Sequence, residues 1–269
     1  MHSAHTGSAR PRSSFQYDVT MGRADTSMGR YLFQREFAFV KRFLGAAAQP
    51  HRLLEVGCGK GQITRALQEA GLQVVGLDID PAALAICQSH SNATPLITGR
   101  MPHLPFADES FDCVIAIECV GYFAHRPFLQ ESNRVLSNGG LLIFDSENQR
   151  SYRWALRRLL GRSATRQLKR LLDRVAEIDP ARTPKILAAD YKLSCREVLQ
   201  ATADSGFDIQ AVSGYNWVPF DVRSDSALVG PAARVEQTLR LDRYYNISPW
   251  FLVAARKRDA ESSHDPRAG

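Results

Sequence analysis

The fold of this chain is decided by residues 53–61, LLEVGCGKG, and residues 74–80, VVGLDID. The first stretch has the pattern of a short apolar strand that runs into a glycine-rich turn. The second has the pattern of a buried strand that ends in the carboxylate of Asp78. Glycine permits positive φ and lets a ligand approach the main chain closely, and a carboxylate at the tip of the next strand can accept hydrogen bonds from ribose hydroxyls. Together the two stretches predict a nucleoside-containing cofactor across the carboxyl ends of a parallel sheet.

The spacing of the glycines discriminates between cofactors. Dinucleotide-binding turns follow G-x-G-x-x-G and direct a helix N-terminus at a pyrophosphate. Here the glycines are Gly57, Gly59 and Gly61, and Gln62 stands where the third glycine of the dinucleotide pattern would be. Glu55 lies two residues before the first glycine, where a carboxylate repels a pyrophosphate but suits a cationic amino-acid group. No G-K-[ST] closes the turn, so the pattern also disfavours a P-loop.

The pattern resembles motif I of the class I S-adenosylmethionine-dependent methyltransferases. Residues 99–116, GRMPHLPFADESFDCVIA, are similar to the adenine-side loop and fourth strand of that family, and residues 134–144, RVLSNGGLLIF, to its turn into strand five. The blocks occur in the family's order over residues 53–146. In layout the chain looks most like ubiquinone-pathway and other biosynthetic O-methyltransferases. The resemblance implies S-adenosyl-L-methionine as the cofactor.

The resemblance also implies roles for individual residues. The glycine-rich backbone would hold the methionine part and Asp78 the ribose, while Asp80 is expected to cap the helix that Pro81 opens. For Glu55 two interpretations stay open, a contact to the loop or ammonium group and a buried structural carboxylate. Many relatives have an acid at the position of Arg100, which cannot accept a hydrogen bond. The implied cofactor-binding residues are Glu55, Gly57, Cys58, Gly59, Gly61, Asp78, Ile79, Arg100, Met101 and Glu118.

Candidate catalytic residues follow strand four, where the family lines the passage from cofactor to acceptor. They are Glu118, Tyr122 and His125, with His125 as a general base; the alternative for His125 is a solvated loop histidine. Glu147 and Asn148 are further candidates for acceptor contacts or helix caps. No metal ligands are predicted, and a metal-dependent catechol-type enzyme is disfavoured, although Asp145 and Asn148 lie where metal ligands could gather. The aromatic residues in 215–220 could form a wall for the acceptor or pack in the core.

The periodicity predicts a Rossmann-like α/β fold with a seven-stranded, mostly parallel sheet flanked by helices. Helices are expected at 27–47, 61–70, 126–136 and after Ser194, where Glu197 completes a capping box. Strands are expected at 52–56, 73–77, 95–97, 112–117, 140–145, 207–213 and 249–255, the last one antiparallel. The predicted organisation is a core over 51–148 and 193–257, a helical cover over 15–50, a basic helical lid over 149–192, and disordered tails over 1–14 and 258–269.

The predicted lid is the most basic part of the chain. Over residues 151–174 an apolar helical stripe lies opposite eight arginine and lysine residues and one acid. The net positive charge of this segment therefore exceeds the formal net charge of +6 of the whole chain. Three interpretations stay open. The segment is a lid with a solvated basic face, a peripheral contact to anionic lipid at the inner membrane surface that includes Trp154, or a cradle for an acidic substrate. Nucleic acid is the least favoured partner, because no nucleic-acid module accompanies the basic face.

Composition bounds the remaining possibilities. The chain of 269 residues is long enough for one large domain, and no apolar run approaches the roughly 20 residues that span a bilayer. Five scattered cysteines without a C-x-x-C pair predict buried, reduced thiols and a cytoplasmic location. The oligomeric state is not predicted.

The sequence therefore predicts a methyltransferase that acts on a small or lipid-like biosynthetic intermediate, such as a quinone precursor or secondary metabolite, at oxygen. Alternatives are an N- or C-methyltransferase and a catalytically silent S-adenosylmethionine-binding regulatory protein. A short-chain dehydrogenase is disfavoured by the glycine spacing and by the missing Tyr-x-x-x-Lys pair.

Overall fold

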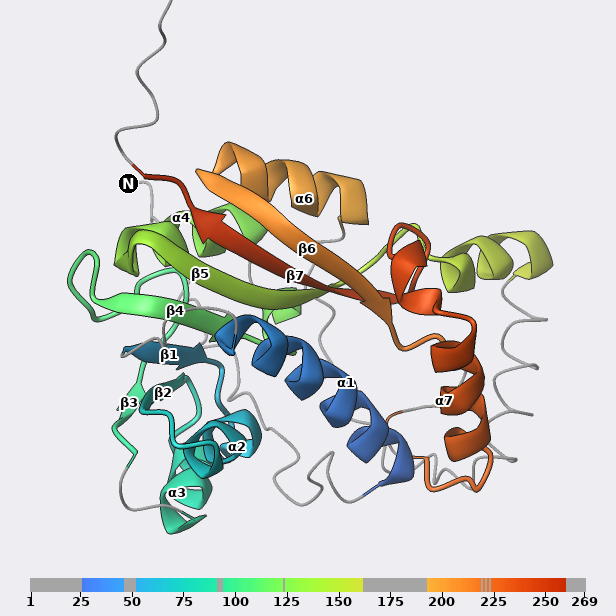
Figure 1. Cartoon of the computed structure of the whole chain (residues 1–269), viewed down its shortest axis with the longest axis horizontal. Coiled ribbons are helices and arrows are strands. Elements are labelled where there is room, and N and C mark those ends of the chain that lie inside the picture. The colour runs from blue at the N-terminus through green and yellow to red at the C-terminus, as the bar shows by residue number, and fades with distance from the viewer. Residues whose placement is uncertain are drawn as a thin grey trace, which may run out of the picture.

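The computed structural model describes residues 26–45, 52–90, 94–122, 124–161, 193–218, 220, 222 and 224–259. Their strands form one seven-stranded sheet in the order β3-β2-β1-β4-β5-β7-β6 (Figure 1). Strands β1 to β5 run parallel to one another, and β7 runs antiparallel to both β5 and β6. The predicted fold class is thus confirmed. The strands are β1 Leu53–Val56, β2 Val74–Asp78, β3 Leu96–Thr98, β4 Phe111–Ala116, β5 Leu136–Glu147, β6 Phe207–Tyr215 and β7 Trp250–Lys257.

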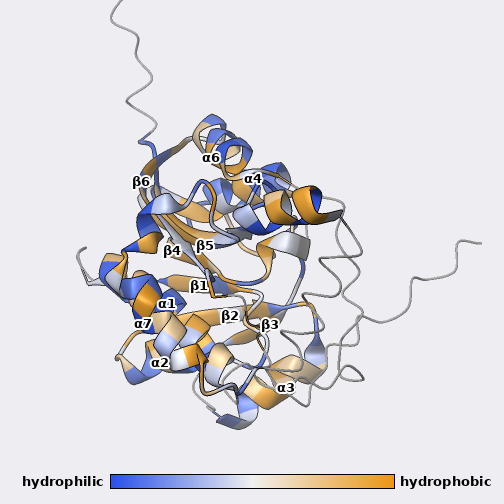
Figure 2. Ribbon diagram, turned by 90° about the vertical axis from the view of Figure 1, so that its right-hand side faces the viewer, coloured by the Kyte–Doolittle hydropathy of each residue, from blue (hydrophilic) through white to orange (hydrophobic). Residues whose placement is uncertain are grey.

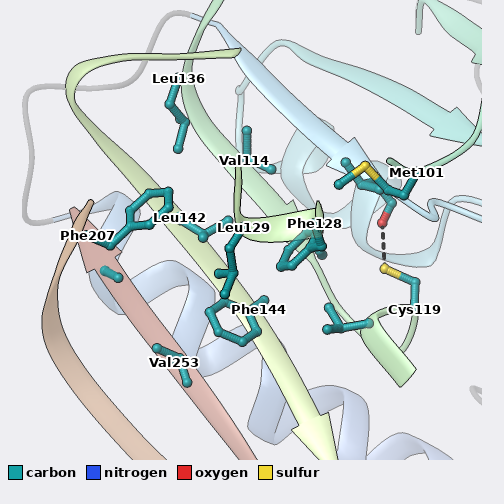
Figure 3. Close-up of a cluster of buried hydrophobic side chains, with 14 of the residues drawn as sticks. Met101, Val114, Cys119, Phe128, Leu129, Leu136, Leu142, Phe144, Phe207 and Val253 are labelled. Atoms are coloured by element: carbon teal, nitrogen blue, oxygen red, sulfur yellow. Dashed lines mark hydrogen bonds between the residues drawn. The ribbon is translucent and has the colours of Figure 1, made fainter. Parts of the chain in front are cut away.

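Helices cover both faces of the sheet, and β5 shows how one strand serves both. Because side chains alternate along a strand, Leu142 and Phe144 join the apolar cluster drawn in Figure 3, whereas Leu141 and Ile143 join the cluster on the opposite face. Apolar colours dominate the central strands in Figure 2. The helices are α1 Ser27–Leu44, α2 Gln62–Glu69, α3 Pro81–His90, α4 His125–Val135, α6 Cys195–Asp204 and α7 Val229–Thr238, with 3-10 helices η2 Val120–Tyr122 and η4 Leu241–Tyr244.

Local signals set most boundaries of these elements. The capping box between Ser194 and Glu197 opens α6, as predicted. Gly71, with φ of +81°, ends α2 in a left-handed conformation. Strand β5 is longer than the predicted 140–145 and begins directly after α4. Helix α7 was not predicted, because Gly230 and Pro231 have low helix propensity. Both residues lie in its first turn.

The topology collects distant parts of the chain at the carboxyl edge of the sheet. The N-terminus of α1 is bonded there to the segment after β6, since Met28 N–H donates to Ser224 O at 3.0 Å. Tyr152 N–H donates to Ile247 O at 2.9 Å and joins the segment after β5 to the approach to β7. The ends of β1, β2, β4 and β5 therefore share one edge with segments far away in sequence.

Only the first part of the basic segment lies among the described residues. Its first part is helical over residues 152–161, the yellow-green helix at the right of Figure 1. Gly161 has φ of +74°, a left-handed conformation that does not continue an α-helix. Residues 162–192, which carry the rest of the predicted lid, lie outside the described residues.

Candidate functional site

The glycine-rich turn is fastened to the neighbouring strand and packed so tightly that side chains are excluded. Gly57 N–H donates to Leu77 O at the end of β2, over 2.7 Å. Gly57 and Gly61 have φ of +72° and +80°. A Cβ on Gly57 would lie 2.5 Å from Cys119 Cβ, and one on Gly61 would lie 2.2 Å from Cys87 Sγ. Glycine is required at both positions for conformation and for space.

Asp78 lies at the tip of β2 and faces this turn. Its side chain is buried; Oδ2 accepts from Gly59 N–H at 2.8 Å and Oδ1 from Asp80 N–H at 2.9 Å. Each carboxylate oxygen keeps a second lone pair, so two further donors can be accommodated. A Cβ on Gly59 would meet nothing within 4 Å, so the turn offers open backbone beside the carboxylate. This donor and acceptor set fits the hydroxyls of a nucleoside ribose.

Asp80 has the capping role that the sequence predicted. Its Oδ1 accepts from Ala82 N–H at 2.9 Å, and its carbonyl accepts from Leu84 N–H at 3.1 Å. It therefore begins α3, in which Pro81 is the first residue.

Glu55 connects β1 to α2. Its carboxylate is buried and accepts a hydrogen bond from Thr64 Oγ1. Burial raises the pKa of Glu55 to about 8, and the bond from Thr64 acts in the opposite direction. Of the two interpretations left open by the sequence, these contacts support the buried structural carboxylate.

The residues predicted on the adenine side separate into buried and exposed ones. Met101 is buried and belongs to the same apolar cluster as Leu77 of β2. Ile79 is 56% exposed, which is high for an isoleucine beside a buried carboxylate. Arg100 is exposed, and its carbonyl accepts from His103 N–H at 3.1 Å. An apolar ligand face at this edge would therefore cover Ile79.

Glu118 lies two residues after the end of β4, at a corner of the backbone. Glu118 has φ of +62°, and its N–H donates to Asp145 Oδ1 at 2.6 Å. The other oxygen of Asp145 accepts from Tyr215 Oη at 2.7 Å. Cys119 then turns back toward β1, where its Sγ donates to Val56 O at 3.1 Å (Figure 3). Sequence reasoning missed this role of Asp145 and Tyr215, although an acid ending an apolar strand was a usable signal.

His125 is the first residue of α4 and is buried, so the alternative of a solvated loop histidine is wrong. Its Nε2 lies 3.0 Å from Ser146 Oγ at the end of β5. Its Nδ1 is buried and has no hydrogen-bond partner in the part of the chain that the structure describes. Burial lowers the pKa of His125, which favours the neutral imidazole at physiological pH. Tyr122, the other predicted catalytic residue of this segment, lies in η2.

A wall of aromatic and polar groups lies beyond β6. Trp217 stacks on Tyr152 with ring centroids 5.4 Å apart, and the backbone N–H of Trp217 donates to Glu236 Oε2 of α7 at 3.3 Å. Burial raises the pKa of Glu236, whose Oε1 lies 3.9 Å from Arg35 Nε. Trp217 Nε1 and Arg35 Nε are buried donors without a hydrogen-bond partner among the described residues. Sequence reasoning missed Arg35 and Glu236, which come from α1 and the unpredicted α7.

Asn148 braces the fold and offers little to a ligand. Its Nδ2 donates to Asn246 O and Ser248 O, and its Oδ1 accepts from Arg150 N–H at 3.0 Å. Glu147 is exposed at the end of β5. Within the described ranges, no group of three or more histidine, cysteine, aspartate or glutamate side chains could hold a metal ion. All five cysteines are free and buried, as predicted.

Comparisons with known proteins identify the same region of the chain. Residues 54–144 match the family model described as a methyltransferase domain. The chain is 43% identical over 100 residues to the phthiotriol/phenolphthiotriol dimycocerosates methyltransferase of Mycobacterium leprae, covering 35% of this chain and 36% of that protein. It is 32% identical over 114 residues to the mitochondrial ubiquinone biosynthesis O-methyltransferase of Mus musculus, covering 39% of this chain and 31% of that protein. The chain thus spans about a third of the length of these relatives.

Solved structures share the fold over a larger part of the chain. A Thermotoga maritima protein described as an SAM-dependent methyltransferase and possible histamine N-methyltransferase superposes with a TM-score of 0.55 at 15% identity. The match covers 86% of this chain and 91% of that one. At this identity the likeness shows the fold, which includes the strands outside the sequence match.

Proposed function

Residues 54–144 belong to the class I S-adenosylmethionine-dependent methyltransferases, and on that premise we propose that the protein transfers a methyl group to a hydroxyl of a small or lipid-like biosynthetic intermediate. The observation that carries the proposal is the open backbone at Gly59 beside the buried Asp78 carboxylate. Names of relatives that include a quinone-pathway and a mycocerosate methyltransferase favour a lipid-like acceptor.

The cofactor supplies a methyl group on a sulfonium, which is already activated for in-line displacement. In our proposal the residues of this chain hold the two reactants at about 3–3.5 Å and exclude water. Asp78 accepts from the ribose, the backbone from Gly57 to Gly61 holds the methionine part, and Ile79 packs on the adenine. Glu118, at the corner after β4, lies between this cofactor edge and the acceptor.

A hydroxyl acceptor must lose its proton, and His125 is the proposed base. The imidazole is neutral because burial lowers its pKa, and Nδ1 is the nitrogen without a hydrogen-bond partner in the described residues. Ser146 fixes the ring through Nε2. Replacing His125 by alanine should lower kcat by about 10²–10⁴-fold, with little change in cofactor affinity. An unchanged kcat would remove His125 from the mechanism.

The wall beyond β6 supports a polar, partly aromatic acceptor. Trp217 Nε1 and Arg35 Nε are buried donors, and the Glu236 carboxylate lies beside them. The opposite charges of Arg35 and Glu236 offset one another, which favours a neutral hydroxyl or carbonyl over a phosphate. The Trp217 ring offers an apolar surface next to these groups.

The test of the proposed function is turnover with methyl-labelled S-adenosylmethionine. Catechol, an isoprenoid hydroquinone and a long-chain alcohol serve as acceptors. We expect a labelled methyl ether and S-adenosylhomocysteine in equal amounts with at least one of them. Transfer to nitrogen or carbon of amine or enol acceptors would overturn the choice of oxygen. Cofactor binding without S-adenosylhomocysteine release with any acceptor would instead support a silent S-adenosylmethionine-binding regulator.

The exposed helix at 152–161 supports peripheral contact with an anionic membrane, as a second element of the proposal. Trp154 is 42% exposed and Leu159 83% exposed, beside Arg157 and Arg158. Arginines that accompany exposed apolar side chains favour anionic headgroups over a neutral interface. No helix among the described residues is long and apolar enough to cross a bilayer.

Vesicle sedimentation tests this contact. The protein should sediment with phosphatidylglycerol vesicles and much less with phosphatidylcholine vesicles, and Leu159→Ser should weaken the binding. Leu228→Ser is the matched control, because Leu228 is also an exposed leucine, at 53%, but lies next to α7. Equal binding of both variants and the wild type would contradict a role for this helix.

A further inference from the structure

The corner after β4 holds a non-glycine residue in a conformation that glycine prefers. Glu118 has φ of +62°, and a non-glycine residue pays for this conformation in free energy. Such strain persists only where the surrounding structure enforces it. The described residues show what enforces it here, because the N–H of Glu118 is held by Asp145 at 2.6 Å.

Asp145 is itself held in place. It is 1% exposed at the end of β5, and its second oxygen accepts from Tyr215 Oη at 2.7 Å. Tyr215 ends β6 and is 1% exposed. The two bonds connect residues 27 and 70 positions apart in sequence, so the ends of β4, β5 and β6 are tied together by one buried carboxylate.

The corner in turn shapes the cofactor turn. Immediately after Glu118, Cys119 packs against Gly57, where a Cβ would lie 2.5 Å from Cys119 Cβ. The Cys119 thiol also donates to Val56 O. Burial raises the pKa of the Cys119 thiol, which therefore stays protonated and able to donate this bond. If Glu118 relaxed to negative φ, Cys119 would move and the turn would lose this support.

We propose that Asp145 and Tyr215 are positioning residues that enforce the left-handed conformation of Glu118 and thereby shape the glycine-rich turn for S-adenosylmethionine. The inference rests on the cofactor site of the proposed function and not on methyl transfer. Neither residue needs to contact the cofactor. Their effect passes through the backbone at position 118, and that route can be tested separately from the stability of the fold.

The experiment is a double-mutant cycle on S-adenosylmethionine affinity, measured by calorimetry. Asp145→Ala should weaken binding about tenfold, as expected when a left-handed residue loses its restraint. Glycine adopts positive φ without strain, so in a Glu118→Gly background the same Asp145→Ala change should cost less than twofold. An equal loss in both backgrounds would overturn the proposal, because a general structural effect does not depend on residue 118.

Two further variants complete the test. Tyr215→Phe removes one hydroxyl and little volume, and it should weaken binding about threefold. It provides the test if Asp145→Ala fails to fold. No loss of affinity with Tyr215→Phe would overturn the role of Tyr215. Thr202→Val is the control: it also removes a buried hydroxyl, but one that bonds within α6, and should leave affinity unchanged. Because the readout is binding, absence of methyl transfer would leave the cycle interpretable, whereas absence of binding in the wild type would refute the cofactor site itself.

Discussion

The two halves of the carboxyl edge are built in different ways. The cofactor half uses residues close together in sequence: the turn after β1 and the tip of β2, with Asp78 bonded to Gly59. The proposed acceptor half is assembled from segments far apart, such as Trp217 after β6 and Glu236 of α7. The first half is a local motif that many acceptors can share. The second depends on how the whole chain folds, and it is where substrate choice is expected to lie.

The largest expected effect tests the cofactor half directly. Asp78→Ala should weaken S-adenosylmethionine binding by at least about 100-fold, because hydrogen bonds to a charged group contribute about 1.5–3 kcal/mol each. The variant also removes the acceptor for Gly59 N–H. Calorimetric titration measures the loss. Asp80→Ala is the control and should stay within about threefold; equal losses would assign the effect to the loop as a whole.

The buried carboxylate of Glu55 makes a second prediction, on stability. Its folded pKa of about 8 lies above the ordinary value of 4.5, so between these pH values the folded state binds a proton that the unfolded state lacks. The free energy of unfolding should therefore fall as pH rises from about 5 to 8, by up to about 1.4 kcal/mol for each pH unit. Glu55→Gln, which stays neutral, should show a flatter dependence in urea titrations. Parallel pH profiles for the two proteins would contradict the raised pKa.

A comparison of Gly61 in the cofactor turn with Gly71 at the end of α2 distinguishes backbone strain from steric exclusion. Gly61 and Gly71 have nearly the same φ, +80° and +81°, but only a Cβ on Gly61 would meet another side chain, Cys87 Sγ at 2.2 Å. Gly71→Ala should cost about 1–2 kcal/mol from conformation alone. Gly61→Ala should cost about 1–2 kcal/mol more, from overpacking. Urea denaturation provides both values, and equal costs would show that Cys87 yields easily.

The smallest effect is expected in the acceptor half. Glu236→Gln keeps the shape of a buried side chain that bonds Trp217 N–H and lies 3.9 Å from Arg35 Nε. Cofactor affinity should stay within about twofold in the calorimetric titration, because no part of this group belongs to the nucleoside site. A tenfold loss would break the separation between the two halves.

The same contrast explains how far the sequence alone could lead. The glycine spacing, the acid at the tip of β2 and the alternation of strands and helices are local, and they predicted the fold class and the residues around Asp78. The corner at Glu118 could be placed but not its restraint, because Asp145 and Tyr215 reach it only through the strand order. Arg35 and Glu236 had no local signal. The positive φ of Gly161 was not predicted, because apolar periodicity does not report the sign of φ.

The measurement that tests the central claim most directly is a crystal structure of the protein with S-adenosylhomocysteine. The account predicts ribose hydroxyls within hydrogen-bond distance of the Asp78 carboxylate and the homocysteine part along the backbone from Gly57 to Gly61. The sulfur should point toward the corner at Glu118, on the side of His125. A ligand bound elsewhere, or one whose ribose makes no contact with Asp78, would contradict the account.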